Sequence, residues 1–207
     1  MPSATLVDDG YYGRAAGPSY GDFFDSEASA VFGGTILFSA NVYGDALFRF
    51  AVTASQGETI ASASLRLQIA SVTNNGSSTA VGTVSAAAED NAAWPTGATG
   101  PLKSANAHGR PRTTATTSVS VTSADIGATI AIDVTAQVQE AVNRAGWVSG
   151  GHVLLFLAGA DGVLATAGVS TAESGVSPQL TFGSSPGTGF NATSGAWMMI
   201  DEQERTP

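Results

Sequence analysis

Residues 134–159 have the sequence VTAQVQEAVNRAGWVSGGHVLLFLAG, which joins a short helical pattern to the most apolar run of the chain. The helical spacing is carried by Val134, Val138, Ala141, Val142 and Ala145. We expect a helix over about residues 136–145, capped by Thr135 or Asp133 and stopped by a left-handed Gly146. A helix this short cannot form a core, but its apolar stripe can close the open end of a β-sandwich, with Trp147 filling the corner. The pattern favours this structural plug over an active-site helix.

The segments around this stretch have the pattern of β-strands. HVLLFLA (152–158) is apolar on both faces, as a central covered strand is. DALFRFAV (45–52), SLRLQIA (64–70), TSVSV (117–121) and TIAIDV (129–134) alternate apolar and polar residues, as half-buried strands do. The side chains predicted for the core are Phe48, Phe50, Leu65, Leu67, Val138, Val142, Trp147 and Leu155. Turn signals separate the strands, so we expect an antiparallel sandwich.

Composition supports one all-β domain. The chain has 207 residues, 25 of them glycine, and only 12% are charged, which favours many short strands and tight turns. The net charge of −9, with a single lysine, argues against nucleic-acid binding, which needs clustered basic residues. No apolar run is long enough to span a membrane, and the start MPSATLVDDG does not resemble a signal peptide, so we expect synthesis in a bacterial cytoplasm. There is no cysteine, so no disulfide or thiolate chemistry is expected.

Both ends of the chain differ in composition from the expected core, residues 45–183. Residues 1–44 are rich in glycine and aromatic residues, and we expect an irregular arm and the first strands there. The aromatic residues that this arm offers for docking are Tyr11, Tyr12, Tyr20, Phe23 and Phe24. The arm is expected either to wrap the domain or to reach a neighbour.

Residues 184–207 follow the last expected strand and begin with the linker-like sequence SSPGTG. They then carry Trp197, Met198, Met199 and Ile200, an apolar cluster that is unusual for a free tail. Two interpretations remain open. The segment is either a final strand folded back on its own domain or an anchor that docks on another subunit.

Several segments, in order along the chain, resemble a known family. They are FRFAVTASQGETIASASLRLQIA, AAAEDNAAWP, RPRTTATTSV, DVTAQVQEAVNRAGWVSG and STAESGVSPQLTF, preceded by DDGYY at residues 8–12. This pattern is similar to that of the DNRLRE-like jelly-roll modules and spans roughly residues 5–183. Such modules occur beside carbohydrate-active domains and in phage virion proteins. The resemblance therefore implies a single antiparallel jelly-roll β-sandwich with a binding or scaffolding role.

The chain departs from that family at two positions. Gln56 stands where a proline is common, which changes only a turn preference. Ala172 stands where an arginine commonly precedes the glutamate, here Glu173, so a charge that could pair with this carboxylate or touch a ligand is missing. A sugar site is therefore not carried over from the family.

The residues that could perform chemistry do not form a catalytic pattern, so we expect no enzyme. His108 and His152 are not at metal-ligand spacing and are interpreted as surface or strand-end residues. The adjacent carboxylates at 8–9, 89–90 and 201–202 point to opposite faces if they lie in strands. No cofactor is expected. A structural calcium ion bound by loop carboxylates such as Asp8, Asp9, Glu89, Asp90 and Asp161 remains an alternative.

Together these observations predict a non-enzymatic structural protein that assembles on a larger particle. The expected particle is a phage virion, with the protein as a capsid decoration, cement or tail component. Its expected partners are other virion subunits and further copies of itself. The alternative is a carbohydrate-binding module of a bacterial surface or secreted protein, or a host-glycan-binding phage module, with Tyr43 and Trp94 among the candidate sugar platforms.

Overall fold

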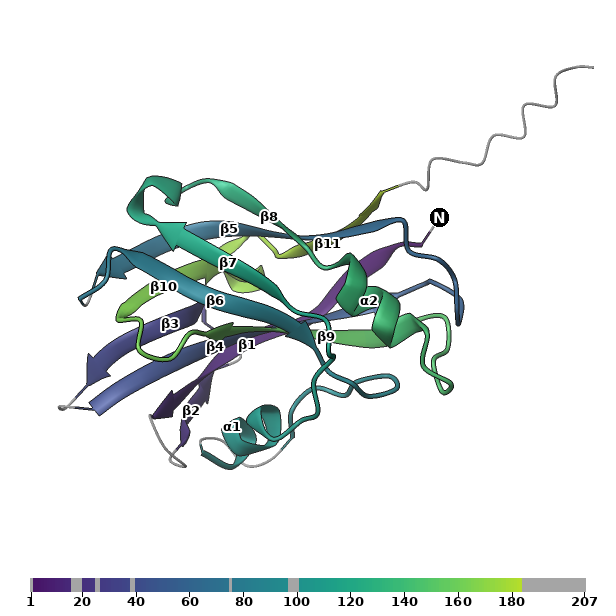
Figure 1. Cartoon of the computed structure of the whole chain (residues 1–207), viewed down its shortest axis with the longest axis horizontal. Helices are drawn as coiled ribbons and strands as arrows, with labels where there is room; N and C mark the ends of the chain where they lie inside the picture. Colours follow the sequence, from purple (N-terminus) through teal and green to yellow (C-terminus); the bar gives the residue numbers. More distant parts are fainter. Residues whose placement is uncertain are drawn as a thin grey trace, which may run out of the picture.

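The computed structural model describes residues 2–15, 20–24, 27–37, 40–74, 76–96 and 101–183, which form an all-β fold (Figure 1). The strands are β1 (Ala4–Ala15), β2 (Tyr20–Phe24), β3 (Ser29–Leu37), β4 (Ala40–Val52), β5 (Ser62–Asn74), β6 (Thr79–Ala86), β7 (Thr117–Thr122), β8 (Thr129–Asp133), β9 (Gly151–Gly159), β10 (Ala165–Ser170) and β11 (Gln179–Gly183). The helices are α1 (Pro101–His108) and α2 (Thr135–Val142), with the short 3-10 helices η1 (Ser123–Asp125) and η2 (Ala172–Ser174). The predicted fold class is confirmed.

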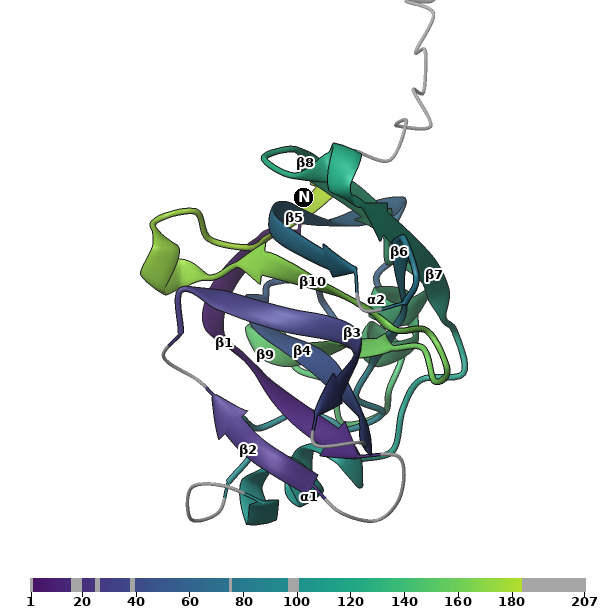
Figure 2. The ribbon, with the colours of Figure 1, turned by 90° about the vertical axis from the view of Figure 1, so that its left-hand side faces the viewer.

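The described strands form one antiparallel sheet that folds over on itself. Its hydrogen-bonded order is β11-β5-β10-β3-β4-β9-β6-β7, with β8 paired to β5 and β1 paired to β4 and β2. In both ribbon views β5 and β8 lie across from β1, β4 and β9 (Figures 1 and 2). The result is a sandwich-like, nearly closed sheet, as the alternating patterns predicted.

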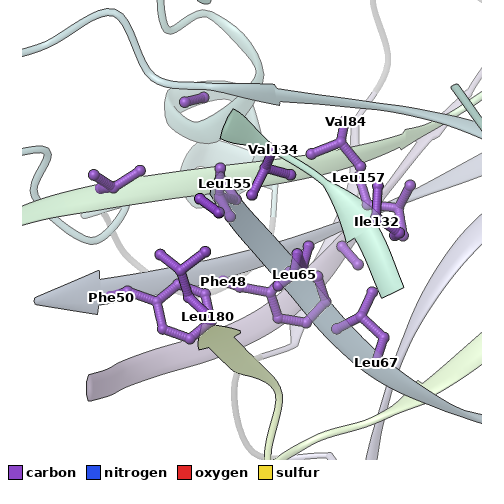
Figure 3. Packing of buried hydrophobic residues seen from close by; sticks show 14 of the residues in the cluster. Phe48, Phe50, Leu65, Leu67, Val84, Ile132, Val134, Leu155, Leu157 and Leu180 are labelled. Atoms are coloured by element: carbon purple, nitrogen blue, oxygen red, sulfur yellow. The ribbon is translucent and has the colours of Figure 1, made fainter. Parts of the chain in front are cut away.

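The main core lies between these two layers. Figure 3 shows Phe48 and Phe50 from β4 gathered with Leu65 from β5 and Leu180 from β11. The alternation seen in the sequence is the cause, because every second residue of a strand points to the same face. The eight side chains predicted for the core are all at most 2% exposed.

Helix α2 covers one end of the sandwich, next to β5 and β6. Its side chains Val138 and Val142 are fully buried, and the Trp147 indole Nε1 donates to the Ala54 carbonyl oxygen at 2.9 Å. The helix begins at Thr135, within one residue of the expected start, but its N-cap residue is Val134 and not Thr135 or Asp133. The Asp133 carboxylate accepts from the backbone N–H of Thr135 at 2.9 Å. No helix in the described ranges is long and apolar enough to cross a membrane.

The predicted end of this helix was wrong. It stops at Val142 rather than near residue 145, and Gly146 does not have the left-handed backbone expected of a stop. A Cβ at position 146 would lie 2.2 Å from Oδ2 of Asp90, so a larger residue there would require the Asp90 side chain to move. The Asp90 carboxylate instead accepts from Arg144 Nε at 2.8 Å, so the close approach serves an ion pair.

The first strands predicted within residues 1–44 are present, but they occupy most of the described part of this segment, where an irregular arm was also expected. β1 pairs with β4 from Ala4 to Ala15, and β3 contributes the fully buried Phe32 to the main core. The register shifts at Val7, a β-bulge that breaks the simple alternation. β4 also runs without interruption across the boundary predicted at residue 44.

Candidate functional site

A groove of about 430 Å³ runs between β1 and β11, and we call it the β1–β11 groove. Leu6, Phe50, Pro178 and Leu180 give it an apolar lining. The exposed side chains of Thr5, Ser177, Gln179 and Thr181 also border it. A concave surface of this composition suits an apolar ligand segment with a few polar contacts at its edge.

The groove exists because two strands lie near each other without pairing. Among the described strands, β11 pairs only with β5, and residues 4–10 of β1 pair only with β4. The two strands still lie close together, so the groove is a surface depression between neighbouring strands and not a gap that could hold another strand. Two features disturb regular pairing between β1 and β11. β1 has a bulge at Val7, and Pro178, which has no backbone N–H, stands just before β11.

Further apolar surface adjoins the groove at each end. A second hollow of about 210 Å³ lies beside the end of β11, lined by Pro2, Ile60, Phe182 and their neighbours. Val176, which precedes the groove-lining Ser177, is 43% exposed. Apolar residues therefore lie near both ends of β11, next to polar lining residues such as Glu58 and Ser177.

A buried carboxyl group ties β1 to the turn at η2. Asp9 is 5% exposed and accepts from the backbone N–H of Ala172 at 2.9 Å. Burial raises the pKa of Asp9 to about 6, against the effect of the Ala172 N–H, and the nearby carboxylates of Glu173 and Asp8 raise it further. Ala172 stands where the DNRLRE-like modules commonly have arginine, and it therefore lies next to the carboxyl groups of Asp9 and Glu173.

The other carboxylate and histidine candidates have structural partners. Asp8 forms an ion pair with Arg49 on the neighbouring strand β4. The His152 ring Nδ1 lies 2.6 Å from the Asn91 side-chain oxygen, which also accepts from the His152 backbone N–H at 3.1 Å. Burial, followed by the charge of Arg49, lowers the pKa of His152. These contacts make His152 a strand-end residue.

A second polar cluster lies on the outer side of β4, near α1. Tyr12 is fully buried, and its hydroxyl contacts Asp45, Arg112 and, at 3.5 Å, Nδ1 of His108. The Arg112 guanidinium lies 3.2 Å from the ring centre of Phe156. Burial is the main cause that raises the pKa of Tyr12 well above its usual range, so the phenol keeps its proton and acts as a structural hydrogen-bonding group.

Of the aromatic residues predicted for docking, some are buried in the fold and others are partly exposed to solvent. Tyr12 and Phe23 are buried, and Phe23 packs edge-on against Trp94 with ring centres 5.8 Å apart. Tyr11 and Phe24 stack on each other at 4.8 Å and stay partly exposed. The side chain of Tyr20, and the apolar residues Trp197, Met198, Met199 and Ile200, lie outside the described part of the chain.

The sequence did not indicate the β1–β11 groove or the cluster that Tyr12 forms with Asp45 and Arg112. Asp45 was interpreted only as the start of a strand, although it is 2% exposed and accepts from the Gly159 N–H at 3.1 Å. An aspartate inside an apolar strand pattern was the one signal available. For calcium, the described residues contain no group of three His, Asp or Glu side chains that could hold a metal ion.

No protein-family model matches the chain, and no curated protein is significantly similar to it in sequence. The likeness to DNRLRE-like modules therefore remains a prediction from the segments quoted above. The β1–β11 groove is the structural basis for the function proposed below.

Proposed function

We propose that the protein is a non-enzymatic structural module that assembles on a larger particle through the β1–β11 groove, and that the particle is a phage virion. The observation that carries this proposal is the groove itself, which combines the apolar residues Leu6, Phe50, Pro178 and Leu180 with exposed polar side chains at its border. A concave surface of this composition can hold a partner segment through apolar contacts and hydrogen bonds at its edge. On a virion, the partners are capsid or tail subunits and further copies of this chain.

The polar residues of the fold support a structural role. Asp8, Asp9 and Asp90 bond to groups that hold strands or turns in place, and His152 is bonded to Asn91. Tyr12, which lies closest to a cluster of charges, has its pKa raised by burial and does not become a base at neutral pH. Each of these groups is therefore bonded to a neighbouring part of the fold.

The alternative function is glycan binding, and one observation favours it. The Tyr11–Phe24 stack is partly exposed, and exposed aromatic faces are what sugar rings bind. By contrast, Trp147 is buried and Trp94 packs against Phe23. The groove therefore supports assembly better than the aromatic residues support sugar binding.

The test is to purify phage particles from the source culture on a density gradient and to quantify this protein by mass spectrometry. The proposal predicts a fixed ratio to the major capsid or tail protein that persists after a salt wash. A matched glycan array with the purified protein tests the alternative. Absence from the particle fraction together with Tyr11-dependent sugar binding would replace the proposal with the alternative.

A further inference from the structure

We propose that the carboxyl groups of Asp9 and Glu173 form a proton-dependent latch, which holds residues 171–178 against β1 in acid and releases them towards neutral pH. We call residues 171–178 the η2 loop. The latch is a property of the isolated protein, so it does not depend on the proposed function.

The η2 loop leaves the sheet between two strands that pair with the same neighbour. β10 and β11 both pair with β5, and their nearest pairs are Val169 with Ile69 and Gln179 with Arg66. Residues 170–178 therefore stand opposite only residues 67–68 of β5, which a continuous strand cannot do. The loop after β10 projects sideways from the sheet (Figure 2), and its residues 172–177 are exposed.

Few contacts join this exposed loop to the rest of the molecule. The buried Thr171 donates through its hydroxyl to the Glu27 carbonyl oxygen. The Ala172 N–H donates to the Asp9 carboxyl group on β1 at 2.9 Å. At the other end, Pro178 is buried and lines the β1–β11 groove. A segment with exposed side chains and few bonds to its surroundings opens more easily than the core strands do.

The contact between Asp9 and Glu173 makes the loop sensitive to pH. Asp9 is 5% exposed, and its carboxyl group lies in hydrogen-bonding contact with that of Glu173. Two carboxyl groups can form a hydrogen bond only when one of them carries a proton. Burial raises the pKa of Asp9 to about 6, so in acid the Asp9 carboxyl group is neutral and can donate to Glu173. At higher pH two carboxylates face each other, and one of them is buried.

The charges around Asp9 favour release once its proton is lost. The charged groups on the surrounding elements are Asp8 on β1, Arg49 on β4, Glu173 on η2 and Glu27 before β3. Asp8 and Glu173 raise the pKa of Asp9, and Arg49 is ion-paired with Asp8. The Ala172 N–H acts in the opposite direction. A buried carboxylate regains hydration when the loop that bonds to it lifts, so deprotonation favours the open loop.

The size of the effect follows from the two states of Asp9. Its pKa is about 6 when the loop is closed, and we assign it the ordinary value of 3.8 when the loop is open and the group is hydrated. Opening therefore becomes easier as pH rises from about 4 to 6 and then stays level. Because one pKa unit is a factor of ten, the opening equilibrium should increase about sixtyfold between pH 4 and pH 8.

The experiment measures amide hydrogen exchange by NMR for the full-length wild type and for Asp9→Asn, at intervals from pH 4 to pH 8. The amides of Ala172, Ser174 and Gly175 report on the loop, because they bond to Asp9 or within the loop. Intrinsic exchange rates also change with pH, so the two proteins are compared at the same pH. Protection of these amides in wild type, relative to the variant, should fall about sixtyfold over this range. The exchange should depend only weakly on urea, because a local opening exposes little surface.

The 3-10 helix η1 provides a matched control. The Asp125 carboxylate accepts from the Thr122 backbone N–H at 2.8 Å, as Asp9 accepts from Ala172. Here the bonds from Thr122 lower the pKa of the carboxyl group, so Asp125 stays charged over the whole range. Asp125→Asn should therefore weaken protection of the Thr122 amide by a similar factor at every pH, and it should leave the pH dependence of the η2 loop unchanged.

A second variant, Glu173→Gln, tests the pair from its exposed side and does not change the buried group. It removes a carboxylate that raises the pKa of Asp9, so the fall in protection with pH should become smaller. An unchanged fall would exclude Glu173 from the latch.

Two further results would overturn the latch. Loop amides that exchange as slowly as those of β9, with the same steep dependence on urea, would mean that Asp9 is exposed only by global unfolding. Loop amides that exchange faster than those of β9, but with the same ratio of wild type to Asp9→Asn at every pH, would mean that Asp9 does not control the loop.

Discussion

Replacing Asp9 by asparagine should make the protein more stable at neutral and basic pH. Asp9 is 5% exposed, and its carboxyl group lies against the Ala172 N–H and beside Glu173. Asparagine keeps an oxygen that accepts from Ala172 and an NH₂ that donates to Glu173, as the protonated acid does. Asp9→Asn therefore imitates the protonated group at every pH.

The magnitude follows from the pKa of Asp9, which burial raises from 3.8 to about 6. Between these two values the folded protein holds a proton that the unfolded chain has released. The free energy of unfolding therefore falls as pH rises through this window, and the fall is complete above the folded pKa. At 1.36 kcal/mol per pKa unit the loss is about 3 kcal/mol. In a domain of this length each kcal/mol shifts the melting temperature by roughly 2–4 °C.

The assay is urea unfolding of wild type and Asp9→Asn at intervals from pH 4 to pH 8. The difference in unfolding free energy between them should grow by about 2.5 kcal/mol over this range, in favour of the variant, because part of the total loss already occurs below pH 4. His152, whose pKa is lowered, has the opposite pH dependence, but it is present in both proteins and cancels in the difference. Glu173→Gln removes one neighbouring carboxylate and should give a smaller effect of the same sign. A constant difference, or a variant less stable at pH 8, would refute the reasoning.

Three further substitutions test other parts of the account. Trp147→Ala should cost about 3–5 kcal/mol in urea unfolding, because it removes a buried ring and its hydrogen bond, and a cost below about half a kcal/mol would mean that the ring is not part of the core. Gly146→Ala should lower the melting temperature, because its Cβ would displace the Asp90 carboxylate, and an unchanged temperature would show that this close approach is dispensable. The double variant His108→Gln with His152→Gln should keep its fold with a loss of about 1 kcal/mol for each hydrogen bond, and stoichiometric transition metal that disappears with the histidines would contradict their structural role.

The strands of the core were predictable because their pattern is local. Phe48 and Phe50, like Leu65 and Leu67, alternate with polar residues, and burial of one face follows from strand geometry alone. The short helix before Trp147 was predictable for the same reason. Its end was not, because the apolar spacing continues to Ala145 while the helix stops at Val142, with Asn143 as its C-cap residue.

The N-terminal strand and the candidate site depend on long-range contacts. In β1 a bulge at Val7 shifts the alternation, and the buried Asp9 makes the segment look like a polar loop. The groove forms because β1 and β11, which lie at opposite ends of the described chain, are neighbours in space but do not pair. No local pattern in either strand indicates which of its edges stays open.

The most direct test asks whether the β1–β11 groove is the surface through which the protein joins a particle. The natural chain has no cysteine, so an introduced thiol is unique. Thr5→Cys, which lies on the groove, and Ser118→Cys, which lies on β7, are each incubated with purified particles and treated with a short thiol-to-amine cross-linker. If the protein assembles through the groove, Thr5→Cys is cross-linked to a capsid or tail subunit and Ser118→Cys is not. Cross-links from Ser118→Cys alone, or equally from both positions, would contradict assembly through the groove.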